Sequence, residues 1–388
     1  MSQRINFVSI ASAVALVASV GAASAQEAIR YGAGLSLTGD WAPVTPGGGM
    51  QCMAEIINEG GGILGQPLEV VIRDSRSDPQ LAVTLGQEYL DEGVIALTGT
   101  PASDSLIPLT QLAMEYGVTV FSAVNTQVEM FQIGDESTFM TASVPDPYNA
   151  AAAAEVAYAK GGRTALLLVS KDYATWTEML PEWFGETFER LGGTVVGRLN
   201  HSVGTTDWSP QITEIKAMDP VPDVIHISSV NPDVGILIRQ LRAAGINSMV
   251  FGSDGFDDIT LADVAGGAAN VDGTVFFATH GFPVEGSKLD QFYKDCTERG
   301  YEVASVFFGL GGDVMLLLKQ GIELAGSTDP TAVREALYAA DSLEGLTSET
   351  FVYKGGPGFP VKKVAVIGFK DGERVLEWFE VPAWVPYF

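Results

Sequence analysis

The chain has 388 residues, 46% of them hydrophobic, which is long enough to bury the cores of two ordinary domains. It carries 48 Asp and Glu residues against 22 Lys and Arg residues, a formal net charge of −26. A field this negative repels nucleic acid and anionic membranes, so neither is expected as a partner.

The first 25 residues have the pattern of a cleavable signal peptide. Arg4 precedes an apolar stretch over 8–21, and Ala23-Ser24-Ala25 supplies the small residues of a cleavage site. The apolar stretch is too short and too rich in Ala and Ser for a membrane span, and no later stretch is long enough. We therefore expect a mature chain that begins at Gln26, lies in the periplasm and inserts no segment into the membrane.

Strand and helix patterns then alternate as far as residue 121. Short apolar runs predict buried strands at 28–35, 68–74, 94–97 and 118–121. Apolar residues at helical spacing predict helices at 50–58, 80–92 and 106–116 between them. Asp78 is the expected N-cap of the second helix, and Gly117 ends the third. This alternation predicts a parallel sheet with right-handed crossovers.

A break at 140–147, with prolines at 145 and 147, separates this unit from a second one of the same kind. The strands expected there are 164–169, 193–197, 224–227, 248–251 and 271–278, and the helices are 148–160, 177–191, 210–218 and 231–244. Three helices follow at 288–299, 305–324 and 330–340, and strands at 351–353, 364–369 and 375–376 complete the chain. The fold class is therefore α/β in both halves.

Two strand ends of the first unit carry small polar side chains. Ser103 and Ser105 follow the strand at 94–97, and Asn125 and Thr126 follow the strand at 118–121. Ligands bind at the carboxyl ends of the strands in such sheets, and the free N–H groups of a helix start suit a carboxylate. Either serine alone could merely cap the helix. The two strand ends together favour a binding site.

The second unit offers a carboxylate and aromatic side chains. Asp254 follows the strand at 248–251, where it could pair with an ammonium group or be an ordinary turn residue before Gly255. Trp41, Tyr173 and Trp176 lie just past strand ends. They would line a cleft there, or they could simply be partly buried.

Cys52 and Cys296 are the only cysteines. In an oxidising compartment they could form a disulfide, and otherwise both would be small buried apolar residues. Their separation in the sequence says nothing about their distance, and we narrowly favour two buried thiols.

Several of these segments, in this order, resemble the type I periplasmic substrate-binding proteins of ABC importers, in particular the leucine/isoleucine/valine-binding family. The resemblance covers nearly the whole chain after residue 25. The residues that carry it are Leu37-Thr38-Gly39, Asn58 with Gly60-Gly61-Gly62-Ile63-Leu64-Gly65, Asp74 with Ser77-Asp78-Pro79, Gly99 with Ser103, Pro232-Asp233 before Arg239-Gln240, and Gly252-Ser253-Asp254-Gly255.

The resemblance implies two Rossmann-like lobes joined by a hinge of three crossing strands, with the ligand cleft between the lobes. It places lobe one at 26–141 and 280–346, and lobe two at 142–279 and 347–388. The implied function is the capture of a small amino acid, branched-chain or otherwise apolar, by lobe closure. The protein would deliver this ligand to the membrane subunits of an ABC permease, and it would need neither a cofactor nor a metal.

The resemblance also implies roles for single residues. Ser103 and the backbone around Ala123 would hold the ligand carboxylate, Asp254 would take the α-ammonium group, and aromatic residues of the second lobe would cover the side chain. The chain departs from the family at Asn125, where a hydroxyl residue is usual and Thr126 could serve instead. It departs again at Val230, where an aromatic residue is common.

Three alternatives to this function stay open. An enzyme is disfavoured because the three histidines are scattered and there is no Gly-x-Ser-x-Gly elbow, P-loop or metal-ligand spacing. A sensor that signals to a membrane receptor would use the same closed lobes. The same scaffold could also bind an amide, urea or an aromatic acid.

Overall fold

The computed structural model describes residue 1 and residues 27–133, 139–173, 175–354 and 358–386. The predicted signal segment therefore lies outside the described residues, apart from Met1. Within the described residues, none of the helices combines the length and the apolar character needed to cross a bilayer.

The first sheet has five strands in the order β2-β1-β3-β4-β5, and every neighbouring pair is parallel, as predicted. Its strands are β1 (Ile29–Leu35), β2 (Leu68–Asp74), β3 (Ala96–Thr98), β4 (Thr119–Ser122) and β5 (Phe139–Thr141). The predicted break at 140–147 was wrong for its first two residues, which belong to strand β5. Three residues are too few to show a strand period, but pairing with β4 makes Phe139–Thr141 a fully buried strand.

The second sheet has seven strands in the order β14-β13-β10-β9-β8-β6-β7. Its strands are β6 (Thr164–Val169), β7 (Thr194–Asn200), β8 (Val224–Ile227), β9 (Met249–Gly252), β10 (Val275–Thr279), β13 (Val364–Lys370) and β14 (Glu373–Glu380). Strands β6 to β10 are parallel to one another, whereas β13 is antiparallel to both of its neighbours, β10 and β14. Strand β10 begins later than predicted because Val271 ends a short helix, α9 (Ala268–Val271). A small separate pair joins β11 (Leu343–Glu344) to β12 (Thr350–Phe351).

Helices cover the faces of both sheets. They are α1 (Gly47–Glu59), α2 (Pro79–Asp91), α3 (Ser103–Tyr116), α4 (Asp146–Ala159), α5 (Leu180–Arg190), α6 (Ser209–Ala217), α7 (Asp233–Ala243), α8 (Leu261–Val264), α10 (Lys288–Glu298), α11 (Val306–Ala325) and α12 (Pro330–Ala339). The predicted N-cap of α2 is confirmed, since the Asp78 carboxylate accepts hydrogen bonds from the N–H groups of Gln80 and Leu81. Gly117 ends α3 in the left-handed region, at φ 69°, where glycine is favoured.

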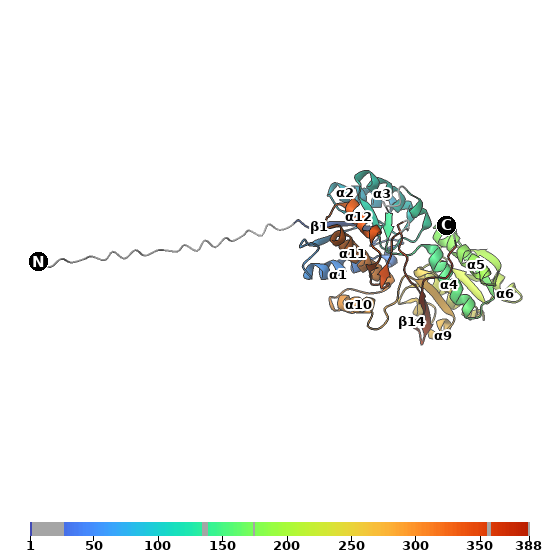
Figure 1. Cartoon of the computed structure of the whole chain (residues 1–388). Helices are drawn as coiled ribbons and strands as arrows, with labels where there is room; N and C mark the ends of the chain where they lie inside the picture. The colour runs from blue at the N-terminus through green and yellow to red at the C-terminus, as the bar shows by residue number, and fades with distance from the viewer. Residues whose placement is uncertain (2–26, 134–138, 174, 355–357, 387–388) are drawn as a thin grey trace.

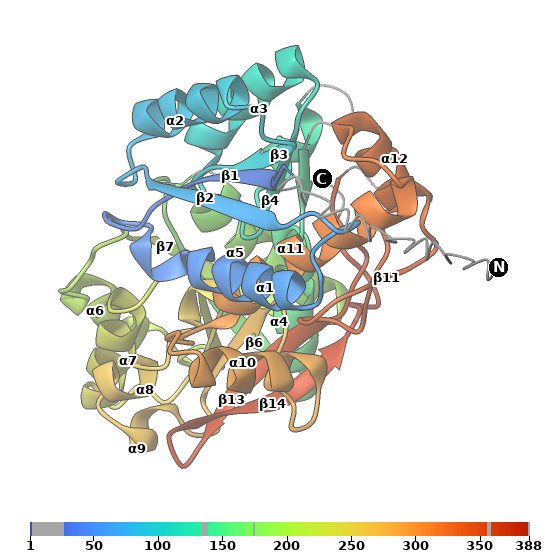
Figure 2. The same ribbon diagram turned by 90° about the vertical axis from the view of Figure 1, so that its left-hand side faces the viewer.

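Two layers of helices enclose the first sheet (Figure 2). Helices α2 and α3 cover one face, where Leu85, Tyr89 and Leu106 are buried. Helices α1 and α11 cover the other face, and α10 and α12 join the same core. A disulfide between Cys52 of α1 and Cys296 of α10, with a Cα–Cα distance of 5.9 Å, links two of these helices. The preference for two free thiols was therefore wrong, because the fold brings together residues 244 positions apart.

Figure 1 shows two lobes, with α1, α2 and α3 in one and α4, α5 and α6 in the other. The order of the elements takes the chain between the lobes three times: between β5 and α4, between β10 and α10, and between β12 and β13. Phe351 and Tyr353 belong to the core of the first lobe. We therefore propose that the last lobe boundary lies after Tyr353, with the other boundaries as predicted from the sequence. The carboxyl ends of β3, β4 and β9 deliver side chains to the space between the lobes.

Candidate functional site

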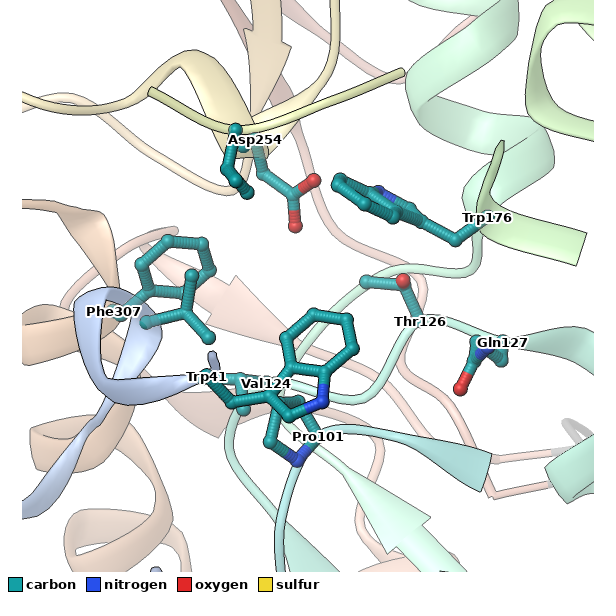
Figure 3. A pocket seen from close by; sticks show the side chains of 11 residues that line it. Trp41, Pro101, Val124, Thr126, Gln127, Trp176, Asp254 and Phe307 are labelled. Carbon is teal, nitrogen blue, oxygen red and sulfur yellow. The ribbon is translucent and has the colours of Figure 1, made fainter. Parts of the chain in front are cut away.

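A cavity of about 420 Å³, counting the part open to solvent, lies between the lobes (Figure 3). Its walls come from both lobes, and apolar and aromatic side chains dominate them. They are Trp41, Val44, Pro101, Val124, Thr126, Gln127 and Phe307 on one side, and Trp176, Val230, Asp254 and Gly255 on the other. A concave, mostly apolar hollow that carries a few polar groups is the usual form of a small-molecule site.

Asp254 is the charged residue of this wall, and its carboxylate points into the space between Trp176, Trp41 and Phe307 in Figure 3. It opens a short 3-10 turn (Asp254–Phe256) directly after β9, and only 5% of its surface is exposed. Its Oδ2 lies 3.0 Å from Nε2 of His280, which follows β10. Its Oδ1 has no hydrogen-bond partner among the described residues.

The state of His280 follows from its surroundings. The side chain is fully buried, and burial lowers its pKa, although the neighbouring Asp254 opposes this shift. The backbone N–H of Val144 donates to Nδ1 at 3.5 Å. A neutral ring that accepts at Nδ1 carries its proton on Nε2 and donates it to Asp254. His280 thus holds one carboxylate oxygen and leaves the other for a ligand.

A second buried acid, Asp146, lies behind Thr126 at the start of α4. Its backbone N–H donates to the carbonyl oxygen of Thr126 at 2.9 Å. Burial raises the pKa of Asp146 well above its ordinary range, and the negative charge of Asp254 raises it further. This shift favours the neutral acid, which leaves Asp254 as the charged group that faces the cavity.

The segment that follows β4 supplies three side chains to the cavity wall. Val124, Thr126 and Gln127 line the cavity, whereas Ala123 and Asn125 do not. Strand β4 ends at Ser122 and the chain bends at residues 123 and 124, so the alternation of a strand does not continue into this segment. The Ala123 carbonyl oxygen accepts from Ser143 at 2.6 Å, and the Asn125 amide donates to the Pro101 carbonyl oxygen at 2.6 Å. Both residues support the wall from behind.

Ser103 opens α3 near the cavity without lining it. The N-cap of α3 is Ala102, so Ser103 does not cap the helix with its hydroxyl group. Its backbone N–H donates to the side-chain Oε1 of Gln127 at 2.7 Å. The start of this helix is therefore in contact with a cavity residue.

The predicted aromatic residues come together. The ring centroids of Trp41 and Tyr173 are 4.8 Å apart, and those of Trp41 and Trp176 are 6.2 Å apart. Trp41 and Trp176 line the cavity itself, and Tyr173 lines an adjacent hollow of about 780 Å³ that shares both tryptophans. Contacts between rings from both lobes make this cluster one side of the cleft.

Sequence reasoning missed Val44, Pro101, Gln127, His280 and Phe307. Phe307 is read as core from sequence because it begins the apolar helix α11. His280 gave no signal, since its partner is 26 residues away. His226 is fully buried in β8. Among the described residues, no group of three or more His, Cys, Asp or Glu side chains is placed to hold a metal ion.

Comparison with known proteins connects this cavity to a family. Residues 28–373 match the sequence model of the periplasmic binding protein family. The chain is 26% identical over 346 residues to a leucine-, isoleucine-, valine-, threonine- and alanine-binding protein of Pseudomonas aeruginosa, and the match covers 87% of this chain and 89% of that protein.

Solved structures give the same result. A leucine-binding protein of Thermotoga maritima is 26% identical and superposes with a TM-score of 0.79, covering 91% of this chain and 99% of that one. A solute-binding protein of an ABC transporter from R. palustris, in complex with benzoate, is 20% identical and superposes with a TM-score of 0.76 over 93% of this chain and 98% of that one. The similarity to the R. palustris protein shows a shared fold.

Proposed function

Because the chain belongs to the periplasmic binding protein family, we propose that it captures a small amino acid, branched-chain or otherwise apolar, between its lobes. The ligand is delivered to the membrane subunits of an ABC permease, and the protein works in the periplasm after the segment 1–25 is removed. The relatives in Pseudomonas aeruginosa and Thermotoga maritima are named for amino acids of this kind, which supports the proposal.

The observation that carries the proposal is the free oxygen of Asp254. A buried ammonium group costs several kcal/mol unless it is paired and hydrogen-bonded. Asp254 offers it a negative charge in a nearly closed site, and the neutral His280 keeps the carboxylate in place without cancelling that charge. The α-ammonium group of an amino acid fits this end of the cavity.

The rest of the cavity suits an aliphatic side chain. Val44, Val124, Val230 and Phe307 provide apolar walls, and the rings of Trp41 and Trp176 add aromatic surface. Burial of apolar surface contributes about 25 cal/mol per Å², so a branched side chain gains more here than a short one. Thr126 and the start of α3 would take the carboxylate.

A ligand panel tests the proposal directly. The mature protein is heated with leucine, isoleucine, valine, alanine, leucinamide, urea or benzoate, and the shift in unfolding temperature is measured. A ligand at about a hundred times its dissociation constant stabilises the folded protein by roughly 2.7 kcal/mol. We expect the aliphatic amino acids to give the largest shifts. Stabilisation by urea or benzoate but by no amino acid would contradict the proposal.

Transport is tested in cells. Deletion of the gene should abolish high-affinity uptake of the radiolabelled ligand found in the panel. Unchanged uptake together with a lost behavioural or transcriptional response to the ligand would assign the protein to sensing instead.

A further inference from the structure

Gln127 occupies the place where the carboxylate of a ligand would meet helix α3. Its side chain lines the cavity and is 6% exposed. Its Oε1 accepts the N–H of Ser103 at 2.7 Å, and the amide nitrogen of Asn125 donates to the same oxygen at 3.4 Å. Two donors on one atom identify that atom as the amide oxygen, so the orientation of Gln127 is fixed by its neighbours.

The start of α3 explains why a side chain is needed there. The first N–H groups of a helix have no partner within the helix, and an N-cap side chain usually accepts from one of them. In α3 the N-cap is Ala102, whose side chain has no polar atom. Gln127 supplies the missing acceptor from the end of the neighbouring strand. A ligand carboxylate is a stronger acceptor for the same group, because it also carries the charge that a helix start favours.

We propose that Gln127 is an internal competitor of the ligand carboxylate and sets the selectivity of the site between acids and their neutral analogues. The inference rests on the proposed function only in assuming a ligand that carries a carboxylate. An acid displaces Oε1 of Gln127 from the N–H of Ser103 before it binds there. An amide of the same shape has no charge to gain from the exchange and leaves Gln127 in place.

Substitution of Gln127 separates this role from a structural one. Gln127→Ala frees the Ser103 N–H, and the affinity for acids should rise by about 3- to 10-fold, the difference that one neutral hydrogen bond makes. Gln127→Glu puts a permanent carboxylate on the helix, so the affinity for acids should fall by about 10-fold or more. A merely structural Gln127 would lower thermal stability and affinity together in both variants.

The probes are two matched pairs, leucine with leucinamide and benzoate with benzamide, titrated by calorimetry into the mature protein. Only the acid of each pair should gain affinity in Gln127→Ala. A gain by at least one acid, with its amide unchanged, supports the competition. The proposal is overturned if neither acid binds Gln127→Ala more tightly than wild type, or if acid and amide gain equally.

A matched variant removes the backbone N–H of Ser103, the donor for which Gln127 and the ligand carboxylate compete. Ser103 is the first helical residue, where proline is well tolerated, and Ala102 before it is extended at φ −82° and ψ 138°, as a residue before proline requires. Ser103→Pro deletes the N–H, and Ser103→Ala controls for the lost hydroxyl group. The gain from Gln127→Ala should vanish in the Ser103→Pro background and persist in the Ser103→Ala background.

Asp254→Asn distinguishes failure of this inference from failure of the proposed function. If the ligand lacks an ammonium group, Asp254→Asn leaves the affinity for it unchanged, and the proposed function is refuted. The response to Gln127→Ala then still shows whether Gln127 competes with the ligand carboxylate. If Asp254→Asn weakens leucine binding but Gln127→Ala does not strengthen it, the proposed function stands and the competition is refuted.

Discussion

At the scale of single residues, the site depends on the two oxygens of the Asp254 carboxylate, which have different surroundings. His280 binds Oδ2 of Asp254 and leaves Oδ1 to the cavity. A histidine that is buried and neutral can donate this bond without adding a positive charge. The pair therefore keeps the negative charge available to a cationic group of the ligand.

Asp254→Asn should lower the affinity for the best amino-acid ligand by about 30-fold or more. The substitution keeps the shape of the side chain and removes the charge that compensates a buried ammonium group, a loss of about 2–5 kcal/mol for such pairs. Calorimetric titration measures the change, with benzoate as the control that carries no ammonium group. An affinity within about 3-fold of wild type, under 1 kcal/mol, would contradict the assignment of an amino-acid ligand.

His226 should make stability depend on pH. Burial lowers its pKa to about 3, from an ordinary 6.5, because it is fully enclosed in β8 and stacks on Phe184 with a centroid distance of 4.3 Å. Below pH 6.5 the unfolded chain binds a proton that the folded chain does not, so stability is lost as pH falls. Relative to wild type, His226→Phe should gain about 2 kcal/mol between pH 7 and pH 5.

Urea unfolding of both proteins at the two pH values measures this gain. The comparison with wild type is essential because buried acids act in the opposite sense. Burial raises the pKa of Asp313, for example, which stabilises the folded protein as pH falls. A difference between the two proteins that stays constant with pH would show that the pKa of His226 is the same in the folded and the unfolded chain.

At the scale of elements, two neighbouring helices begin in different ways. The Asp78 side chain caps α2, while α3 begins after Ala102 and depends on Gln127. Asp78→Ala should therefore lower the free energy of unfolding by about 0.5–2 kcal/mol. Ser103→Ala should change it by less than about 0.5 kcal/mol, because its hydroxyl group caps nothing. Equal losses in chemical denaturation would mean that Ser103 caps α3 after all.

The disulfide ties α1 to α10 across a long loop of chain. Cross-linking restricts the unfolded chain, and removal of a native disulfide typically costs about 2–5 kcal/mol. The double variant Cys52→Ser, Cys296→Ser should lose stability in this range when unfolded in urea. Reduction of the wild-type protein should have the same effect and should leave the double variant unchanged. A stability unaffected by both treatments would show that the link adds nothing.

At the scale of the whole molecule, the cavity exists only between the two lobes, and its walls come from both. A ligand that contacts both walls stabilises the closed arrangement over the open one, in proportion to its differential affinity for the two. Small-angle scattering should therefore show a smaller radius of gyration with saturating ligand. The variant Asp254→Asn at the same ligand concentration serves as the control. A constant radius with proven binding would argue against closure.

Much of the fold follows from local patterns in the sequence. The periods of apolar residues predict the strands and helices of both halves, and caps such as Asp78 and Gly117 fix where helices begin and end. These signals are local because a buried strand or an amphipathic helix needs its apolar residues at a fixed spacing. Strand β5 was not predicted because three residues are too few to show a period. Its pairing with β4 decides its structure.

The sequence by itself determined the α/β class, the two-unit order, the candidate acid Asp254 and the aromatic residues Trp41 and Trp176. Tertiary structure alone decided which partners meet. It joined His280 to Asp254, paired Cys52 with Cys296, and placed the side chain of Gln127 against Ser103 at the cavity wall. The physical reason is that these contacts join residues distant in sequence, and no local period of apolar residues records such contacts.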